Sequence, residues 1–175
     1  MKENMLGLEK GIVVLHEYSF EWEKLFEQER ASLQGLLDDS VVEIQHIGST
    51  AVPNLISKPI IDILLGVRSS DVVSQMKSQL EDIGYTYRLN GSDENQVLFV
   101  KGPEEKRTYY LHITEYGSKT WKNYLAFRDY LRVHPEAVQK YAELKKELAA
   151  HYPQKRELYT QGKKRFIQGV LDARK

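Results

Sequence analysis

The sequence contains no cysteine and no long apolar run, and both absences narrow the class of protein. Without cysteine, the chain cannot form disulfides, bind zinc through thiolates or use a cysteine nucleophile. No apolar stretch approaches the roughly 20 residues of a membrane-spanning helix. The N-terminal segment MKENMLGLEKGIVVLHEY also lacks the continuous apolar core and the small-residue cleavage site of a signal peptide. We therefore expect a cytoplasmic protein that does not enter a membrane.

The chain also lacks a net charge, but its charges are unevenly distributed. Residues 1–117 carry a formal net charge of −8, whereas residues 118–175 carry +8. In one interpretation, two halves of a domain attract each other and otherwise present solvated faces. In the other, a basic wall faces an anionic ligand such as a nucleotide phosphate. The sequence shows no basic motif with interleaved aromatic residues, so we expect no specific nucleic-acid partner.

The length of 175 residues is that of one ordinary domain, and 41% apolar with 29% charged residues is typical of a globular protein. Apolar patterns predict strands over 41–47, 59–67, 96–101 and 107–116, and either a short strand or an extended lead-in over 12–18. Helical spacing and capping residues predict helices from Ser19 to the turn at 38–40, over 69–84, from Ser118 to His134, from Pro135 towards Pro153 and over 157–173. The predicted fold class is therefore α+β. A single domain over 1–175 would hold a small mixed β-sheet flanked by helices, with a helical C-terminal third.

One carboxylate stands inside a strand-like apolar run, in the stretch HIGSTAVPNLISKPIIDI at residues 46–63. A buried, unpaired Asp62 would cost several kcal/mol, about the scale of a buried ion. In a structural interpretation, Asp62 accepts hydrogen bonds from the Gly-Ser-Thr turn or pairs with Lys58. In a functional interpretation, Gly48, Ser49 and Thr50 bind phosphate, and Asp62 holds Mg²⁺ against it. The residues alone leave both interpretations open.

The whole pattern resembles the GrpB family and, more widely, the polymerase-β-like nucleotidyltransferase fold. The segment HIGSTAVPNL followed by KPIIDI is the most specific part of the resemblance. VVLHEYSFEWEKLFEQER precedes it, and LHI, FRDYLRVHP, YAELKKELA and YTQGKKRFI follow in the family's order. The resemblance covers nearly the whole chain and implies the same α+β fold.

For function, the resemblance implies a nucleotide-binding protein. The nucleotidyltransferase pattern is Gly-Ser after a strand, followed on the next strand by two acids that flank one apolar residue. Gly48, Ser49 and Asp62 match it, but Leu64 occupies the place of the second acid. Two residues apart on a strand share a face, so two acids there would chelate metal ions together. A one-metal site completed by His112, which would also serve in acid–base chemistry, remains open.

Two functional hypotheses follow from this incomplete pattern. The first is Mg²⁺-dependent transfer of a nucleotidyl or phosphoryl group to a small molecule or a protein, with Asp62 and His112 as catalytic and metal-binding residues. The second is a nucleotide- or coenzyme A-binding module without catalysis, which Leu64 favours. A third interpretation is a structural pocket without a ligand. The sequence names neither the nucleotide nor the acceptor.

Four further residues are candidates for phosphate contacts. His46 shares the predicted face of Val42 and Ile44, so it is either a core histidine or, two residues before Gly48, a ligand-binding residue at the turn. Lys58 precedes Pro59 and should be extended, within reach of Asp62 or of phosphate. Arg128 and Lys163 match the family pattern and are the candidates for triphosphate contacts. Taken singly, each charge is also explained as a solvated surface group.

Overall fold

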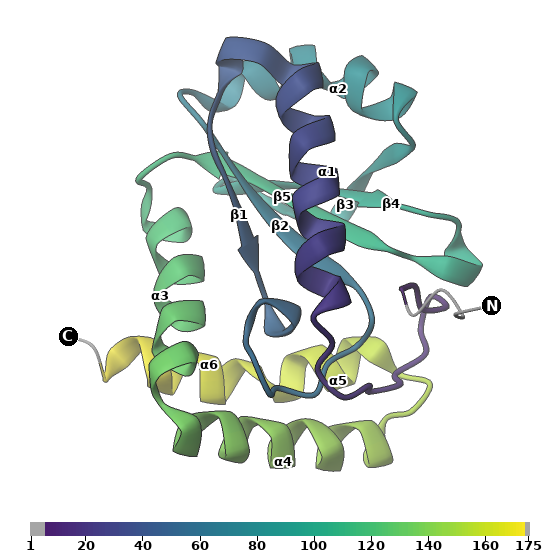
Figure 1. The fold of residues 1–175 in the computed structure, drawn as a ribbon, viewed down its shortest axis with the longest axis vertical. Coiled ribbons are helices and arrows are strands. Elements are labelled where there is room, and N and C mark those ends of the chain that lie inside the picture. Colours follow the sequence, from purple (N-terminus) through teal and green to yellow (C-terminus); the bar gives the residue numbers. More distant parts are fainter. Residues whose placement is uncertain (1–5, 174–175) are drawn as a thin grey trace.

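The structure is a computed structural model that describes residues 6–173; the beginning of the segment assessed for a signal peptide lies outside this range. Five strands form one mixed sheet in the order β1-β2-β5-β4-β3 (Figure 1). Strands β2 and β5 are parallel, and the other neighbours are antiparallel. The bounds are Val41–Ile47 for β1, Ile61–Val67 for β2, Tyr85–Asp93 for β3, Gln96–Lys101 for β4 and Tyr109–Glu115 for β5. The predicted fold class is confirmed.

Helices α1 (Glu21–Leu37) and α2 (Val73–Asp82) cover one face of this sheet (Figure 1). Trp22, Phe26 and Leu33 recur on one side of α1 at helical spacing and are buried. They pack on the strand residues that point to the same side, including Ile63 and Leu65 of β2. This apolar layer is the main core of the protein.

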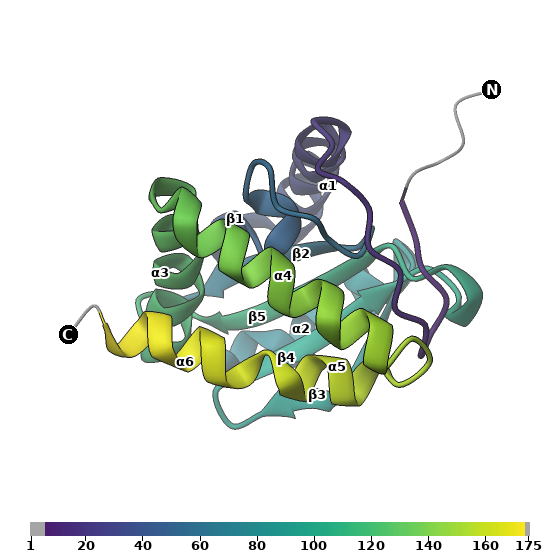
Figure 2. The same cartoon turned by 90° about the horizontal axis from the view of Figure 1, so that it is seen from below.

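The helical C-terminal third lies on the other side of the sheet. It consists of α3 (Lys119–Val133), α4 (Pro135–His151), α5 (Arg156–Gly162) and α6 (Lys164–Asp172). Helix α4 and the α5–α6 pair run side by side across the lower end of the molecule in Figure 1, as the view from below in Figure 2 also shows. On this side Trp121 of α3 packs on Ile47 and Leu64. The sheet thus separates a closed apolar core from a face that carries the helices of the basic half.

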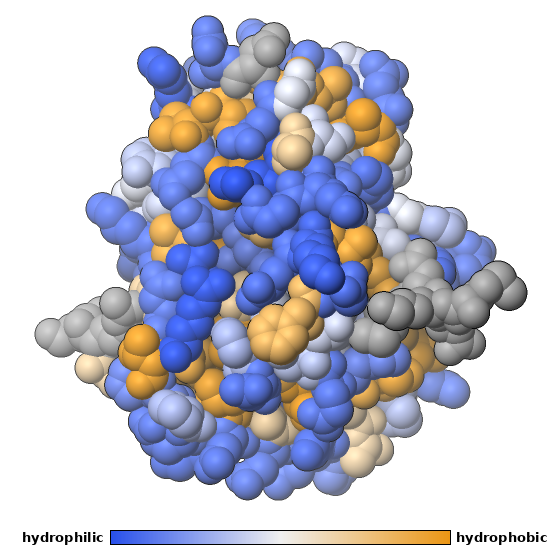
Figure 3. Space-filling model, viewed as in Figure 1, coloured by the Kyte–Doolittle hydropathy of each residue, from blue (hydrophilic) through white to orange (hydrophobic). Residues whose placement is uncertain are grey.

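Strand register decides which side chains reach this second face. Asp62 lies opposite Ile47 on β1 and Tyr110 on β5, and Leu64 lies opposite His112. Because side chains alternate along a strand, these residues point away from α1 and α2. The described residues contain no helix that is both long and apolar enough to cross a bilayer. Figure 3 shows mainly hydrophilic side chains on the face seen in Figure 1, with apolar side chains in separate patches.

Of the two alternatives predicted for 12–18, the structure shows the lead-in to α1 rather than a strand, since within it only His16 makes a β-bridge, with Ser57. Its partner is the loop before β2, where Pro59 has no N–H group to extend a ladder. Strand β3 was not predicted, because Tyr85 is its only buried residue, so it has no apolar face, and it includes Gly91 at φ 110°. Val42 does not share the buried face of Ile44, because the strand register shifts between Val41 and Glu43.

The helix predicted over 157–173 is divided at Lys163, which lies between α5 and α6. At Gly162 the helix approaches α4 so closely that a β-carbon would lie 2.4 Å from Leu148. The helix predicted over 69–84 begins as a 3₁₀ turn at Ser70–Val72, capped by the Ser69 hydroxyl, and continues as α2. The hairpin of β4 and β5 is confirmed, and so are the helices on either side of Pro135.

Candidate functional site

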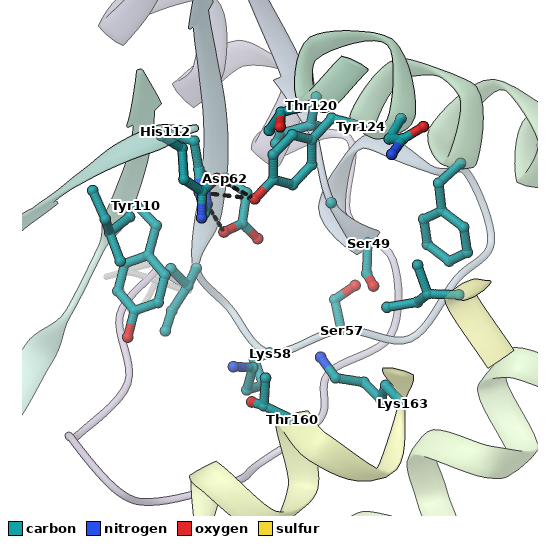
Figure 4. A pocket seen from close by; sticks show the side chains of 18 of the residues that line it. Ser49, Ser57, Lys58, Asp62, Tyr110, His112, Thr120, Tyr124, Thr160 and Lys163 are labelled. Atoms are coloured by element: carbon teal, nitrogen blue, oxygen red, sulfur yellow. Dashed lines mark hydrogen bonds and ion pairs between the residues drawn. The ribbon is translucent and has the colours of Figure 1, made fainter. Parts of the chain in front are cut away.

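A cavity of about 540 Å³ lies between the second face of the sheet and the C-terminal helices (Figure 4). Its walls come from the ends of β1, β2, β4 and β5, from the loop between β1 and β2, and from all four C-terminal helices. Gly48, Ser49, Lys58, Asp62, His112 and Lys163 all line it. Six of the nine residues predicted from the sequence are therefore brought together around one space.

Asp62 begins a chain of hydrogen-bonding groups along one wall of this cavity. Its Oδ1 lies 3.4 Å from Nε2 of His112, and Nδ1 of His112 lies 3.3 Å from the hydroxyl of Tyr124. The Tyr124 hydroxyl donates to Oε1 of Gln96 at 2.7 Å. The Gln96 amide in turn donates from Nε2 to the carbonyl of Gly91 at 2.9 Å. These contacts join β2, β5, α3 and the β3–β4 hairpin.

The donor and acceptor roles along these hydrogen bonds determine when His112 can donate a hydrogen bond to Asp62. Because the Tyr124 proton goes to Gln96, Nδ1 of His112 must be the donor to the Tyr124 oxygen. Nε2 can then donate to the Asp62 carboxylate only when the imidazole carries both protons. The pair is satisfied when one proton lies between Asp62 and His112. Burial, with the charge of Asp62, raises the pKa of Tyr124 far above its usual range, so Tyr124 stays neutral.

The Gly-Ser turn holds the other side of the Asp62 carboxylate. Gly48 ends β1 with φ 71°, and a 3₁₀ turn follows at Ser49–Ala51. The Ser49 side chain hydrogen-bonds Tyr141 of α4. Asp62 is 31% exposed, and within residues 6–173 no lysine or arginine nitrogen lies within 4 Å of its carboxylate oxygens. It is therefore a cavity-lining carboxylate rather than a member of a buried ion pair with Lys58.

Three lysines from separate segments form the opposite end of the cavity. Lys58 comes from the loop before β2, Lys145 from α4 and Lys163 from the junction of α5 and α6. Figure 4 shows Lys58 and Lys163 facing this space across from Asp62 and His112. Among the described residues, no carboxylate oxygen lies within 4 Å of any of the three amino groups.

Aromatic rings and one carbonyl, rather than carboxylates, surround these amino groups. The Tyr159 ring centroid lies 4.7 Å from Nζ of Lys163 and 5.6 Å from Nζ of Lys58. Nζ of Lys145 lies 5.0 Å from the Tyr141 ring centroid and donates to the carbonyl of Ile56. Such cation–π contacts stabilise a charge by about 0.5–2 kcal/mol, which compensates burial only in part.

The pKa values of the three lysines reflect this environment. Burial, followed by the charges of Lys163 and Arg156, lowers the pKa of Lys58 to about 7. Burial lowers the pKa of Lys163 to about 8 against the opposing effect of Asp62. Burial, with the charges of Lys163 and Lys58, lowers the pKa of Lys145 well below its usual range. The charge of Asp62 opposes the lowering in all three lysines but does not compensate it.

Lys145, Tyr141 and Tyr159 are cavity residues that the sequence analysis missed. Lys145 is only 1% exposed, and it follows Ala137 and Tyr141 at helical spacing on the buried side of α4. A lysine at an apolar position of an amphipathic helix was the available signal. Its pairing with Lys58 and Lys163 was not predictable, because it depends on how α4 and α5 pack against the loop.

His46 and Thr50 were predicted at the ligand but do not line the cavity. His46 points to the α1 side of the sheet, where its ring stacks on Phe26 with centroids 4.7 Å apart. Its Nε2 lies 2.9 Å from Oγ1 of Thr50, and both residues are buried. In this structure they fasten the turn to the core.

Arg128, a predicted triphosphate contact, also does not line the cavity. Its Nη1 donates to the carbonyl of His46 at 3.0 Å and to Oε1 of Gln45 at 2.6 Å. Its Nε donates to Oδ1 of the neighbouring Asp129 at 2.8 Å. Arg132, one turn later, donates to the carbonyl of Ala51 at 2.9 Å. The two arginines bind the backbone on both sides of Gly48 and hold the turn to α3.

The side chains near Asp62 do not fit a metal centre built by the protein. Within residues 6–173, no three His, Asp or Glu side chains are grouped so that they could hold a metal ion. Leu64, at the place of a second acid, is fully buried against Trp121. Mg²⁺ requires near-octahedral oxygen coordination, and the protein offers it one carboxylate. Position 64 therefore supplies no second metal-binding acid, by packing as well as by residue type.

The fold is that of the nucleotidyltransferases. The Cid1 poly(U) polymerase, in a structure described as Mg 3′-dATP bound, aligns with a TM-score of 0.50 and 17% identity. The match covers 77% of this chain and 43% of the polymerase. At this identity the likeness shows the fold alone.

Within that fold, the chain belongs to the GrpB family, because the family's model, described as GrpB protein, matches residues 12–173. The glutamate-rich protein GrpB of Alkalihalophilus pseudofirmus is 37% identical over 96% of this chain and 99% of its own length. YqkA of Bacillus subtilis is 41% identical over 86% of this chain, but the chain spans only 43% of YqkA. The crystal structure of the conserved protein GrpB from Enterococcus faecalis aligns with a TM-score of 0.83 and 36% identity, over 90% of this chain and 94% of that one.

Proposed function

We propose that the cavity binds the phosphate groups of a nucleotide or of a closely related phosphate-bearing small molecule. The observation that carries this proposal is the convergence of Lys58, Lys145 and Lys163 without a carboxylate partner among the described residues. Burial and neighbouring positive charges lower the pKa values of these lysines and so disfavour their charged forms in the free protein, and a multiply charged anion between them removes that cost. Phosphate oxygens accept several charge-assisted hydrogen bonds at once.

The other cavity residues support a ligand with both a charged and an apolar part. The hydroxyls of Ser49, Ser57 and Thr160 lie near the lysine end and supply further hydrogen bonds to phosphate (Figure 4). Phe127, Tyr124 and Leu98 give the remainder of the wall an apolar and aromatic character. Small-molecule sites commonly combine an apolar lining with a few convergent polar groups. A nucleoside attached to phosphate satisfies both ends.

We favour binding over Mg²⁺-dependent transfer, which was the first hypothesis from the sequence. Transfer through two metal ions needs a second acid beside Asp62, and buried Leu64 stands there. Asp62 and His112 remain the groups that would hold a single Mg²⁺, whose other ligands would be oxygens of the bound phosphate and water. That ion would supply positive charge to the phosphate. The lysines orient the ligand in either case.

Calorimetric titration tests the proposal directly. ATP, GTP, CTP, UTP and coenzyme A are titrated, each with Mg²⁺ and with EDTA, into wild type, Lys163→Gln and Asp62→Asn. Lys122→Gln, an exposed lysine on α3, is the matched control for the loss of one positive charge. We expect at least one ligand to bind and Lys163→Gln to weaken it roughly tenfold, which corresponds to about 1.4 kcal/mol. Lys122→Gln should bind like wild type.

Asp62→Asn separates the contribution of the metal from that of the lysines. If Asp62 meets a cation, binding of the same ligand should be stronger with Mg²⁺ than with EDTA in wild type, and equal in the variant. The proposal fails if none of the five ligands binds wild type, or if Lys163→Gln and Lys122→Gln have the same affinity for each ligand.

A further inference from the structure

A second, more open cavity of about 680 Å³ adjoins the first one. Its walls come from the chain around Lys10, from the β3–β4 hairpin and from α5 with the residues before it. Lys58, Leu98, Tyr110 and Thr160 line both cavities. The two spaces are therefore neighbours that share one wall, and the second opens on the far side of Tyr110.

The second cavity is strongly basic. Its lining includes six cationic side chains and one acidic side chain, Glu157; the cations are Lys10, Lys58, Arg88, Lys155, Arg156 and Lys164. Lys10 is paired with Glu104. Among the described residues, no carboxylate oxygen lies within 4 Å of the charged groups of Arg88, Lys155 or Lys164. The lining of the second cavity thus contains more cationic side chains than are paired with carboxylates of the described residues.

The shared wall is held in place by hydrogen bonds rather than by a ligand. Arg156 donates from Nη1 to the Tyr110 hydroxyl at 3.1 Å, and from Nε to the carbonyl of Ile12 at 3.0 Å. It also donates from Nη2 to the carbonyl of Glu9 at 2.6 Å. Tyr110 is therefore fixed beside Lys58 at the boundary, where Figure 4 shows both along one side of the first cavity. An extended anionic ligand that crosses the boundary between the two cavities would contact Lys58 from either side.

We propose that the second cavity binds a further phosphate group of the same ligand, so that the ligand is an extended polyphosphate or bisphosphate that passes Tyr110 and Lys58. This inference rests on the proposed function and specifies its ligand class. Single-stranded nucleic acid is disfavoured, because it is usually held by bases stacked on aromatic rings. Tyr110 is the one aromatic side chain in the described lining of the second cavity, and amides of Asn90, Gln154 and Gln161 fill the space between the cations.

The test compares a short and a long anion on matched pairs of variants. Inorganic tripolyphosphate, a long-chain linear polyphosphate and a thymidine oligonucleotide are titrated into wild type and into Lys155→Gln/Lys164→Gln. Both substituted lysines are exposed, so the fold is preserved. The control is Lys122→Gln/Lys146→Gln, which removes two exposed positive charges from α3 and α4. Lys163→Gln reports separately on the first cavity.

We expect Lys155→Gln/Lys164→Gln to weaken long-chain polyphosphate by roughly three- to tenfold, the scale for two exposed charge contacts. Tripolyphosphate affinity should change less than twofold, and the control pair should leave both affinities near those of wild type. If the two double variants weaken binding equally, only the overall loss of positive charge matters, and the inference is overturned. Weakening of the oligonucleotide but not of polyphosphate would assign the cavity to nucleic acid and also overturn it. Loss of the Lys163 effect on tripolyphosphate would instead overturn the proposed function.

Discussion

The turn at Gly48 and the carboxylate of Asp62 are in direct contact. A β-carbon at position 48 would lie 2.6 Å from Oδ2 of Asp62. Gly48 also has φ 71°, a left-handed conformation that is costly for residues with a side chain. Glycine is therefore required here for two separate reasons, and one of them is the position of Asp62. The turn sets the distance between the carboxylate and Ser49 in the cavity wall.

Gly48→Ala should therefore destabilise the protein more than a left-handed glycine elsewhere does. Gly117 is the matched control, because it has φ 73° and no atom lies within 4 Å of the added β-carbon. Gly117→Ala should lower the free energy of unfolding by about 1–2 kcal/mol through backbone conformation alone. Gly48→Ala should lower it further through the clash with Asp62. Urea unfolding of both variants measures the difference, and equal losses would show that the contact with Asp62 carries no energy.

The same stretch shows what a sequence can reveal about such a site. Gly48, Ser49 and Asp62 lie in two strands and one turn, so apolar pattern and glycine position were enough to place them together. His112 was placed correctly because its strand pairs with β2. His46 shares the buried face of Ile44, as predicted, and the structure fits the interpretation of His46 as a core histidine; the register shift at Val41 moves only Val42 off this face.

The lysine cluster marks the limit of this reasoning. Lys58, Lys145 and Lys163 meet only because α4 and α5 pack on the loop before β2, and no local pattern encodes those contacts. Arg128 matched the family motif, yet its side chain binds the backbone of His46 instead of facing the cavity. Charge asymmetry between the two parts of the chain left open whether the basic part faces a ligand; Lys145 and Lys163 of that part line the cavity together with Lys58 of the acidic part. Which lysines line the cavity depended on tertiary packing.

Leu64→Asp should not restore a metal centre. Leu64 is fully buried against Trp121, so the new carboxylate would be removed from water without a partner. The free energy of unfolding at pH 7 should fall by about 3 kcal/mol or more. Burial would raise the pKa of this carboxyl above its unfolded value, so the loss should shrink as pH falls towards 4.

Leu64→Asn provides the control for Leu64→Asp, because it introduces a similar polar shape without a charge. It should lower stability by an amount that does not depend on pH. Thermal unfolding of both variants from pH 4 to pH 8, with and without Mg²⁺, makes the comparison. Stabilisation of Leu64→Asp by Mg²⁺ would contradict our assignment of this position to the core.

His46 should make the protein less stable in mild acid. Burial lowers the pKa of His46 from 6.5 to about 4, against the opposing effect of Asp62. The folded state therefore keeps His46 neutral while the unfolded state becomes protonated as pH falls below 6.5. Its contribution to stability is complete above that pH and is lost progressively down to about pH 4. At pH 5 the loss amounts to roughly 2 kcal/mol.

Urea unfolding at pH 7.5 and pH 5 tests this dependence in wild type and in His46→Asn. The variant should be less stable at pH 7.5, because it loses the stacking on Phe26. Between pH 7.5 and pH 5 it should lose less stability than wild type by the contribution of the missing imidazole. His134→Asn, a half-buried histidine bonded to the carbonyl of Tyr130, is the control and should keep the dependence of wild type. An unchanged dependence in His46→Asn would assign the acid sensitivity to other groups.

Binding of an anion to the lysine cluster should take up protons near pH 8. The pKa values of Lys58 and Lys163 are about 7 and 8 in the free protein, so both amines are partly deprotonated there. A bound phosphate chain favours their charged forms and raises both pKa values. The terminal proton of inorganic tripolyphosphate also titrates between pH 7 and pH 9, so the lysine contribution is the difference between proteins: over this range the affinity of wild type relative to Lys163→Gln should fall. Calorimetry at pH 8 in two buffers of different ionisation enthalpy counts the protons, and the net proton uptake should be smaller for Lys163→Gln than for wild type or Lys122→Gln. The same net proton count in all three proteins would show that these lysines do not meet the anion.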